Sequence, residues 1–131
     1  MRYLLDANVV IGLLNDSTSL LARRARREKP SDIAISAIVM HELYYGAFKS
    51  RRAVHNVALI DALQFAILEF DKEDSRQAGE IRALLASRGT PISPYDVQIA
   101  GQAKALKLIF VTHNTSEFRR VSGLRVDDWH A

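Results

Sequence analysis

The chain has 131 residues and a mass of 14.7 kDa, which is the size of one domain with its own hydrophobic core. Its 48% hydrophobic and 25% charged residues are typical of a globular protein, and the absence of cysteine excludes disulfide frameworks, iron–sulfur clusters and thiolate zinc sites. The net charge of +3 is too small to establish nucleic-acid binding by itself. No apolar run reaches the ~20 residues that span a bilayer, so we expect a cytoplasmic protein that does not enter the membrane.

Short apolar runs alternate with helical patterns along the chain. Strands are expected at residues 3–5, 33–36, 67–70, 108–112 and 124–126. Helices are expected at residues 7–14, 20–27, 37–48 and 54–65, from residue 71 to a stop at Gly89, from residue 94, and near residue 116. In the helix at 54–65, an apolar stripe is expected to contain Val54, Val57, Ala58 and Phe65. The alternation predicts an α/β fold of three layers, a mainly parallel, roughly five-stranded sheet between helices, in a single domain over residues 1–131.

Two acidic residues occupy positions where a carboxylate needs an explanation. Asp6 ends the first predicted strand, at the sheet edge where α/β proteins bind ligands, although it could instead cap the next helix. Glu42 lies beside Ile38, Val39 and Gly46 on the apolar side of its helix. A buried carboxylate without a partner is costly, so we expect Glu42 to contact a cation or a metal ion, or to lie at the rim of the sheet. The alternative is a partly exposed Glu42 with only the stem of its side chain buried.

Two further polar residues also have two interpretations. Asp96 is the third residue of a helix that Ser93 would cap, which is a capping-box pattern, but it also precedes Ile99 on the buried face of that helix. Asn114 follows a strand and could cap a short helix, with Glu117 three residues later. Taken alone, the Asp96 position favours a cap, and the Asn114 position is ambiguous.

Together, three carboxylates from separate segments fall at the same predicted edge of the sheet. Hard oxygen ligands suit Mg²⁺ or Mn²⁺, which leave coordination positions for water and a substrate phosphate. This pattern indicates phosphate chemistry. The four histidines show no metal-ligand spacing with one another, and each is predicted to be a surface or structural residue.

Other motifs narrow the choice of chemistry. The sequence contains no Walker A loop, GxGxxG or GxSxG motif, and His41-Glu42 lacks the second histidine of a zinc-protease helix. Two basic blocks, within residues 23–29 and 49–52, could contact RNA phosphates or an acidic partner, or could be solvated helix faces.

The order and spacing of these motifs resemble the PIN-domain ribonucleases, specifically the VapC-type toxins of type II toxin–antitoxin pairs. The resemblance covers nearly the whole chain and is carried by the motifs Leu5-Asp6-Ala7-Asn8, Met40-His41-Glu42-Leu43, Tyr95-Asp96, Val111-Thr112-His113-Asn114 and Gly123-Leu124-Arg125-Val126-Asp127-Asp128-Trp129. It implies a metal-dependent endoribonuclease that acts on structured RNA such as tRNA, with Asp6, Glu42 and Asp96 as the catalytic and Mg²⁺- or Mn²⁺-binding residues. Many relatives carry a fourth acid after the late strand, where this chain has Asn114. We therefore expect Asn114, together with Thr112 and Asn8, to contact water or substrate.

The resemblance also implies partners. Such toxins form homodimers and bind a small VapB-like antitoxin, for which the predicted helices at 20–27 and 54–65 are the candidate surfaces. The alternatives are a module that binds RNA or protein without cleavage, its three acids being two helix caps and a rim glutamate, and a PIN-like nuclease that acts on DNA. A contact to the RNA 2′-hydroxyl would separate the ribonuclease from the last of these.

Overall fold

The five strands of the computed structural model, which describes residues 1–130, form one parallel sheet in the order β3-β2-β1-β4-β5. The strands are β1 (Tyr3–Leu5), β2 (Ile33–Ser36), β3 (Ala66–Leu68), β4 (Ile109–Val111) and β5 (Val126–Asp127). The predicted α/β class and parallel sheet are thus confirmed. The predicted domain extends to Ala131, which lies outside the described residues.

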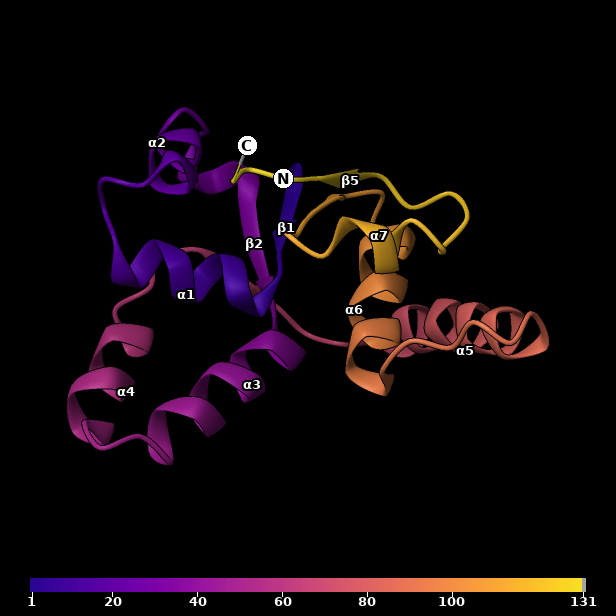
Figure 1. The fold of residues 1–131 in the computed structure, drawn as a ribbon, viewed down its shortest axis with the longest axis horizontal. Coiled ribbons are helices and arrows are strands. Elements are labelled where there is room, and N and C mark those ends of the chain that lie inside the picture. Colours follow the sequence, from indigo (N-terminus) through magenta and orange to yellow (C-terminus); the bar gives the residue numbers. More distant parts are fainter. Residues whose placement is uncertain (131) are drawn as a thin grey trace.

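Helices connect the strands and cover both sides of the sheet. They are α1 (Ala7–Asn15), α2 (Leu20–Arg26), α3 (Ala37–Phe48), α4 (Ala53–Asp61), α5 (Lys72–Ser87), α6 (Pro94–Ala105) and α7 (Thr115–Phe118), with one 3₁₀ turn at Pro30–Asp32. In Figure 1, α1 to α4 lie on one side of β1 and β2, and α5, α6 and α7 lie on the other. Within residues 1–130, no helix combines the length and the apolar character needed to cross a membrane.

The central strands explain why the apolar runs predicted the sheet so well. All residues of β1 and β2 are buried, as expected for parallel strands with helices on both faces. The core continues through Phe110 of β4, which packs edge-on against Phe118 at a centroid distance of 4.6 Å. The helices α5 and α6 approach closely at Gly101, where a Cβ atom would lie 2.6 Å from the backbone nitrogen of Ala78.

The bounds of the peripheral strands and of one helix were predicted less accurately than those of the central strands. The strand β3 begins one residue earlier than predicted and ends at Leu68, and its side chain Ile67 is 45% exposed. The last strand lies at Val126–Asp127 and not at 124–126. The helix α4 ends at Asp61, so Phe65 lies beyond it, and Val54 is 89% exposed, so the predicted apolar stripe is wrong at both ends. Edge elements bury one side at most, and their periodicity is correspondingly weak.

Candidate active site

The Asp6 side chain joins the ends of two neighbouring strands. It follows β1 directly and caps α1, where its Oδ1 accepts a hydrogen bond from the Ala7 backbone N–H at 2.8 Å. Its Oδ2 accepts a second hydrogen bond from the hydroxyl of Thr112, just past β4, at 2.7 Å. The cap and the ligand-edge interpretations of Asp6 are therefore both compatible with the structure. The β1–β4 boundary is also where the chain reverses its order across the sheet, the usual place of ligand sites in α/β proteins.

Glu42 has a carboxylate oxygen with no protein partner. It lies in the second turn of α3, and its side chain is partly buried. Its Oε1 is buried and makes no hydrogen bond to any of residues 1–130. Burial raises the pKa of Glu42 above its ordinary value, and the charges of Asp6 and Asp96 raise it further. A buried oxygen that no side chain satisfies, beside two other carboxylates, is what a cation-binding position requires.

Asp96 stands in the first turn of α6. Ser93 caps this helix, and its hydroxyl accepts a hydrogen bond from the Asp96 backbone N–H at 3.2 Å. The predicted capping box is wrong in its second half, because the Asp96 carboxylate makes no return bond to the Ser93 backbone within the described chain; a complete box occurs instead at Asp71 and Asp74 of α5. Burial raises the pKa of the Asp96 carboxyl group, the nearby Ser93 hydroxyl lowers it by interacting with the carboxylate, and the charges of Asp6 and Glu117 raise it.

Glu117 is a fourth acid at this place, and sequence reasoning missed it. It belongs to the short helix α7, and its negative charge raises the pKa of both Asp6 and Asp96, which places it beside them. The sequence interpretation used Glu117 only as the capping partner of Asn114. The edge argument that selected Asp6 would also have found it, because α7 begins where β4 ends.

The three expected contact residues have different outcomes. Thr112 is fully buried, bonds Asp6 and accepts the Asn114 backbone N–H at 3.1 Å. Asn114 is exposed and precedes α7, but its side chain does not cap the helix; its amide Nδ2 donates a short hydrogen bond to Glu117. Asn8 is exposed on α1 and makes no side-chain hydrogen bond among residues 1–130. The first two residues therefore support the acids, and Asn8 is free on the surface.

The electrostatics of the cluster favour a cation. Burial is the main reason why the pKa of Asp6 is raised, against the hydrogen bonds from Thr112 and Ala7 that lower it, and Glu117 adds a further increase. Several carboxylates that raise one another's pKa repel in the ionised state, and a divalent ion relieves that repulsion. The donors are hard oxygens, which fits Mg²⁺ or Mn²⁺ better than a soft metal.

A cavity adjoins the cluster on the side of α3. It has a volume of about 510 Å³ and is lined by His41, Glu42, Tyr45, Gly46, Lys49 and Tyr95. The rings of His41 and Tyr95 meet edge to face with centroids 5.8 Å apart, and the Lys49 ammonium lies 4.7 Å from the centre of the Tyr45 ring. A carboxylate, exposed aromatic rings and a cation thus share one hollow.

The prediction for the histidines was incomplete. His41 and His55 are exposed, as expected for surface residues. His113 and His130 are distant in sequence, but the pairing of β4 with β5 brings their rings to a centroid distance of 4.5 Å, with Asp128 between them. Spacing along the chain cannot reveal this pair, because it depends on which strands are neighbours.

Comparison with known proteins identifies the family of the chain. The PIN domain family matches residues 3–124 of the chain. The chain therefore belongs to the PIN-domain family.

Relatives define its place in that family. The chain is 37% identical over 131 residues to the tRNA(fMet)-specific endonuclease VapC of Shigella flexneri, with 98% of each covered. It matches the crystal structure of DNA-bound VapBC from Salmonella typhimurium with a TM-score of 0.93, at 36% identity over 98% of both chains. It matches VapBC-1 from nontypeable Haemophilus influenzae with a TM-score of 0.89, at 30% identity over 100% of both chains. Within the PIN domains, the chain belongs with the VapC ribonucleases.

Proposed function

We propose that the chain is a Mg²⁺- or Mn²⁺-dependent endoribonuclease of the cytoplasm, the toxin of a toxin–antitoxin pair, with residues 1–131 as one PIN domain. The observation that carries the proposal is the convergence of Asp6, Glu42 and Asp96 from three segments of the chain, with one buried oxygen of Glu42 left without a partner. The tRNA specificity named for the Shigella flexneri relative supports structured RNA, including tRNA, as the substrate.

In this proposal Asp6, Glu42 and Asp96 hold the metal, and Glu117 completes the negative field around it. A bound divalent ion supplies charge neutralisation at the scissile phosphate and a more acidic water. The protein's own residues hold the carboxylates in place. The Thr112 hydroxyl and the Ala7 N–H fix the two oxygens of Asp6, and the Ser93 cap fixes the start of α6 below Asp96. Asn114 orients Glu117 and is exposed to water or substrate.

The cavity beside Glu42 is where the RNA would lie. Tyr45 and Tyr95 are 63% and 47% exposed, and both line this cavity. Unpaired bases stack on exposed aromatic rings, and a lysine attracts the backbone phosphates. Lys49, at the same rim, supplies that charge, and the neighbouring Arg51 and Arg52 extend it along the exposed surface. Stacking at this position would set an unpaired nucleotide next to the carboxylates.

A VapB-like antitoxin would inhibit the enzyme by covering the same region. A second, smaller hollow of about 250 Å³ lies among α1, α3 and α4; its lining includes Ile11, Leu14, Leu59 and Ile60, and it reaches Glu42. An apolar segment of a partner in this hollow would exclude RNA from Glu42. The solved relatives from Salmonella and Haemophilus are VapBC complexes, which supports such a partner. We also propose that the chain forms a homodimer, as expected from the family.

The test is a cleavage assay with purified protein on total tRNA and on a DNA strand of matched sequence, with Mg²⁺, Mn²⁺ or chelator. Asp96→Asn removes one charge of the cluster and keeps the Ser93 backbone cap, while Glu73→Gln removes an exposed charge elsewhere and serves as the control. We expect discrete RNA fragments that disappear with chelator and with Asp96→Asn, that persist with Glu73→Gln, and no cleavage of DNA. Cleavage that survives chelation, or tight RNA binding without cleavage under any metal, would contradict the proposal.

A further inference from the structure

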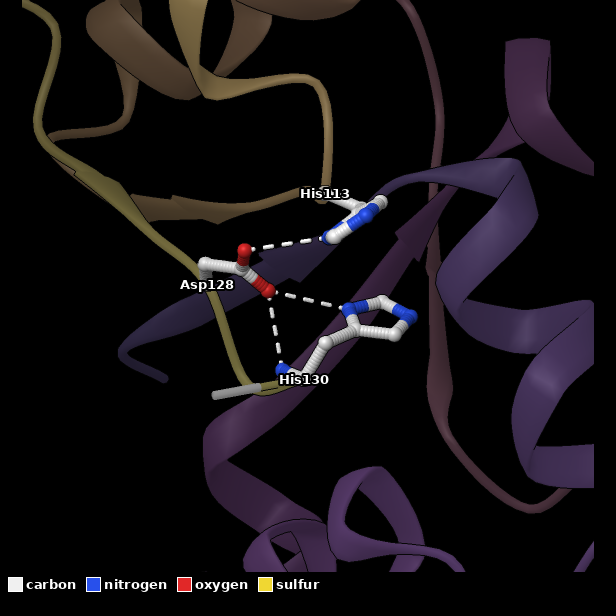
Figure 2. A group of neighbouring side chains, drawn as sticks. All are labelled: His113, Asp128 and His130. Carbon is white, nitrogen blue, oxygen red and sulfur yellow. Dashed lines mark hydrogen bonds and ion pairs between the residues drawn. The ribbon is translucent and has the colours of Figure 1, made fainter.

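Three further side chains that could hold a metal ion, none of them one of the four acids, come together between the loop after β4 and the segment after β5. Figure 2 shows Asp128 between His113 and His130, with both rings turned toward its carboxylate. The Nδ1 atom of His113 lies 3.1 Å from Oδ2, and the Nδ1 atom of His130 lies 2.9 Å from Oδ1. The Oδ1 atom also accepts the His130 backbone N–H at 2.8 Å. One potential ligand atom from each residue therefore lies within 4.8 Å of the others.

The spacing of these atoms is close to that of a chelate. Zinc binds imidazole nitrogen and carboxylate oxygen at about 2.0–2.2 Å, so two ligands of a tetrahedral ion lie about 3.3 Å apart. The two nitrogen–oxygen distances already have nearly this value. The two Nδ1 atoms must move slightly closer together to bind one ion. The ring of His113 is free to make this movement, because its side chain is 70% exposed.

The carboxylate between the rings is ready to act as an anionic ligand. Burial raises the pKa of Asp128, but in the metal-free chain hydrogen bonds from the His130 backbone and from both histidine rings outweigh this effect and hold the pKa below its ordinary value. A bound ion would take the place of the proton at each Nδ1 atom, because only a deprotonated imidazole nitrogen can be a ligand. Asp128 is only partly buried, and the side chains of Asp128 and His130 are 25% and 31% exposed. A small ion and its water ligands can therefore reach the cluster from solvent.

We propose that His113, Asp128 and His130 form a site for a borderline transition-metal ion, with Zn²⁺ as the reference ion. Two imidazoles and one carboxylate are a ligand set that Zn²⁺, Co²⁺ and Ni²⁺ accept, whereas Mg²⁺ prefers oxygen alone. Three protein ligands leave at least one coordination position open for water. The site differs in both ligand chemistry and residues from the cluster of Asp6, Glu42 and Asp96.

The position of the site gives it a structural consequence. His113 belongs to the loop after β4, whereas Asp128 and His130 follow the edge strand β5. The residues on either side of His113 are Thr112, bonded to Asp6, and Asn114, bonded to Glu117. A metal ion would therefore clamp the C-terminal segment to the loop that supports two of the acids. Binding only to the folded chain would raise the melting temperature in proportion to the logarithm of the free ion concentration.

The experiment is a titration of the untagged full chain with Zn²⁺ by calorimetry and with Co²⁺ by visible absorption. All proteins carry Glu42→Gln, which weakens the carboxylate cluster as a competing site and leaves the histidines intact. Into this background we introduce His113→Gln or His130→Gln, and His55→Gln on the exposed face of α4 is the matched control. His113 is so exposed that its replacement is not expected to disturb folding, and circular dichroism checks this.

We expect one ion per chain in the background protein and in the His55→Gln control, with a Co²⁺ spectrum that contains imidazole ligands. Each of the two ligand variants should bind at least about tenfold more weakly and lose the rise in melting temperature with Zn²⁺. Equal binding by the background protein and by folded His113→Gln and His130→Gln would overturn the proposal, as would an equal loss with His55→Gln. Because the readout is binding and melting, the result is independent of whether the chain cleaves RNA.

Discussion

The hydrogen bond from Thr112 to Asp6 links the site to the stability of the fold, and Thr112→Val tests it with little change of shape. The side chain is fully buried, and its hydroxyl makes two hydrogen bonds, to Asp6 Oδ2 at 2.7 Å and from the Asn114 backbone N–H at 3.1 Å. Valine replaces the hydroxyl by a methyl group and so removes both hydrogen bonds. Thr112→Ser keeps the hydroxyl and is the matched control.

The expected magnitude follows from the charge on Asp6. A hydrogen bond to an ionised group contributes about 1.5–3 kcal/mol, and one between neutral groups contributes about 1 kcal/mol. Thr112→Val removes one bond of each kind, so we expect it to lower the free energy of unfolding of the metal-free protein by about 2.5–4 kcal/mol at neutral pH. The loss should be smaller in acid, where Asp6 is protonated.

The sign of the pH effect follows from the pKa of Asp6. The Thr112 hydrogen bond lowers this pKa, so its loss raises the pKa further above the value in the unfolded chain. A carboxyl group with a raised pKa in the folded state contributes stability in acid that is lost as the pH rises through the folded pKa. The variant should thus lose more stability than the wild type between acid and neutral pH.

Denaturant unfolding of the wild type, Thr112→Val and Thr112→Ser, each with chelator at acid and neutral pH, measures this difference. In the cleavage assay, Thr112→Val should also shift the acid limb of the activity profile to higher pH. The reasoning is refuted if Thr112→Val and Thr112→Ser lose equal stability, or if the loss is the same at both pH values.

Three further predictions test other parts of the structure. Glu42→Gln should abolish cleavage but stabilise the metal-free protein at neutral pH by about 0.5–2 kcal/mol, because it removes the charge of a carboxyl group whose pKa is raised. No gain is expected in acid, where Glu42 is already neutral. Thermal melts with chelator measure this difference, and an equal gain in acid would contradict charge repulsion as its cause. Gly101→Ala should destabilise the fold by about 1–3 kcal/mol, because the new Cβ atom would meet the backbone of Ala78. Gly79→Ala should not, because a Cβ atom there meets nothing within 4 Å. Denaturant melts measure both variants, and equal stability of the two would rule out a close contact between the helices at Gly101. Lys49→Ala should weaken RNA binding and reduce the slope of log K against log salt by about one, measured by fluorescence anisotropy at several salt concentrations; an unchanged slope would place the RNA elsewhere.

The centre of the fold could be predicted from sequence because burial there is nearly complete. The run Ile33–Ser36 is buried at every position, and a short apolar run of this kind predicts a buried strand without any knowledge of which strands lie beside it. The edge elements could not be predicted to the residue, because Ile67 and Val54 are apolar residues that remain exposed. An apolar residue at the edge of the sheet or on a peripheral helix is therefore not necessarily buried.

The site was predictable where it follows from the ends of strands and helices. Asp6 directly follows β1 and Asp96 lies in the first turn of α6, and both positions can be located in the sequence from local patterns. Glu117 could have been found in the same way, because α7 follows the end of β4. The histidine pair could not, because His113 meets His130 only where β4 pairs with β5.

In the proposed function, one cation site made by the carboxylates is also the site of cleavage. The most direct test is to measure Mn²⁺ binding by electron paramagnetic resonance and tRNA cleavage on the same preparations of the wild type, Asp96→Asn and Glu73→Gln. We expect Asp96→Asn to lose tight Mn²⁺ binding and cleavage together, while Glu73→Gln keeps both. Full cleavage by a folded Asp96→Asn protein that no longer binds Mn²⁺ would contradict it.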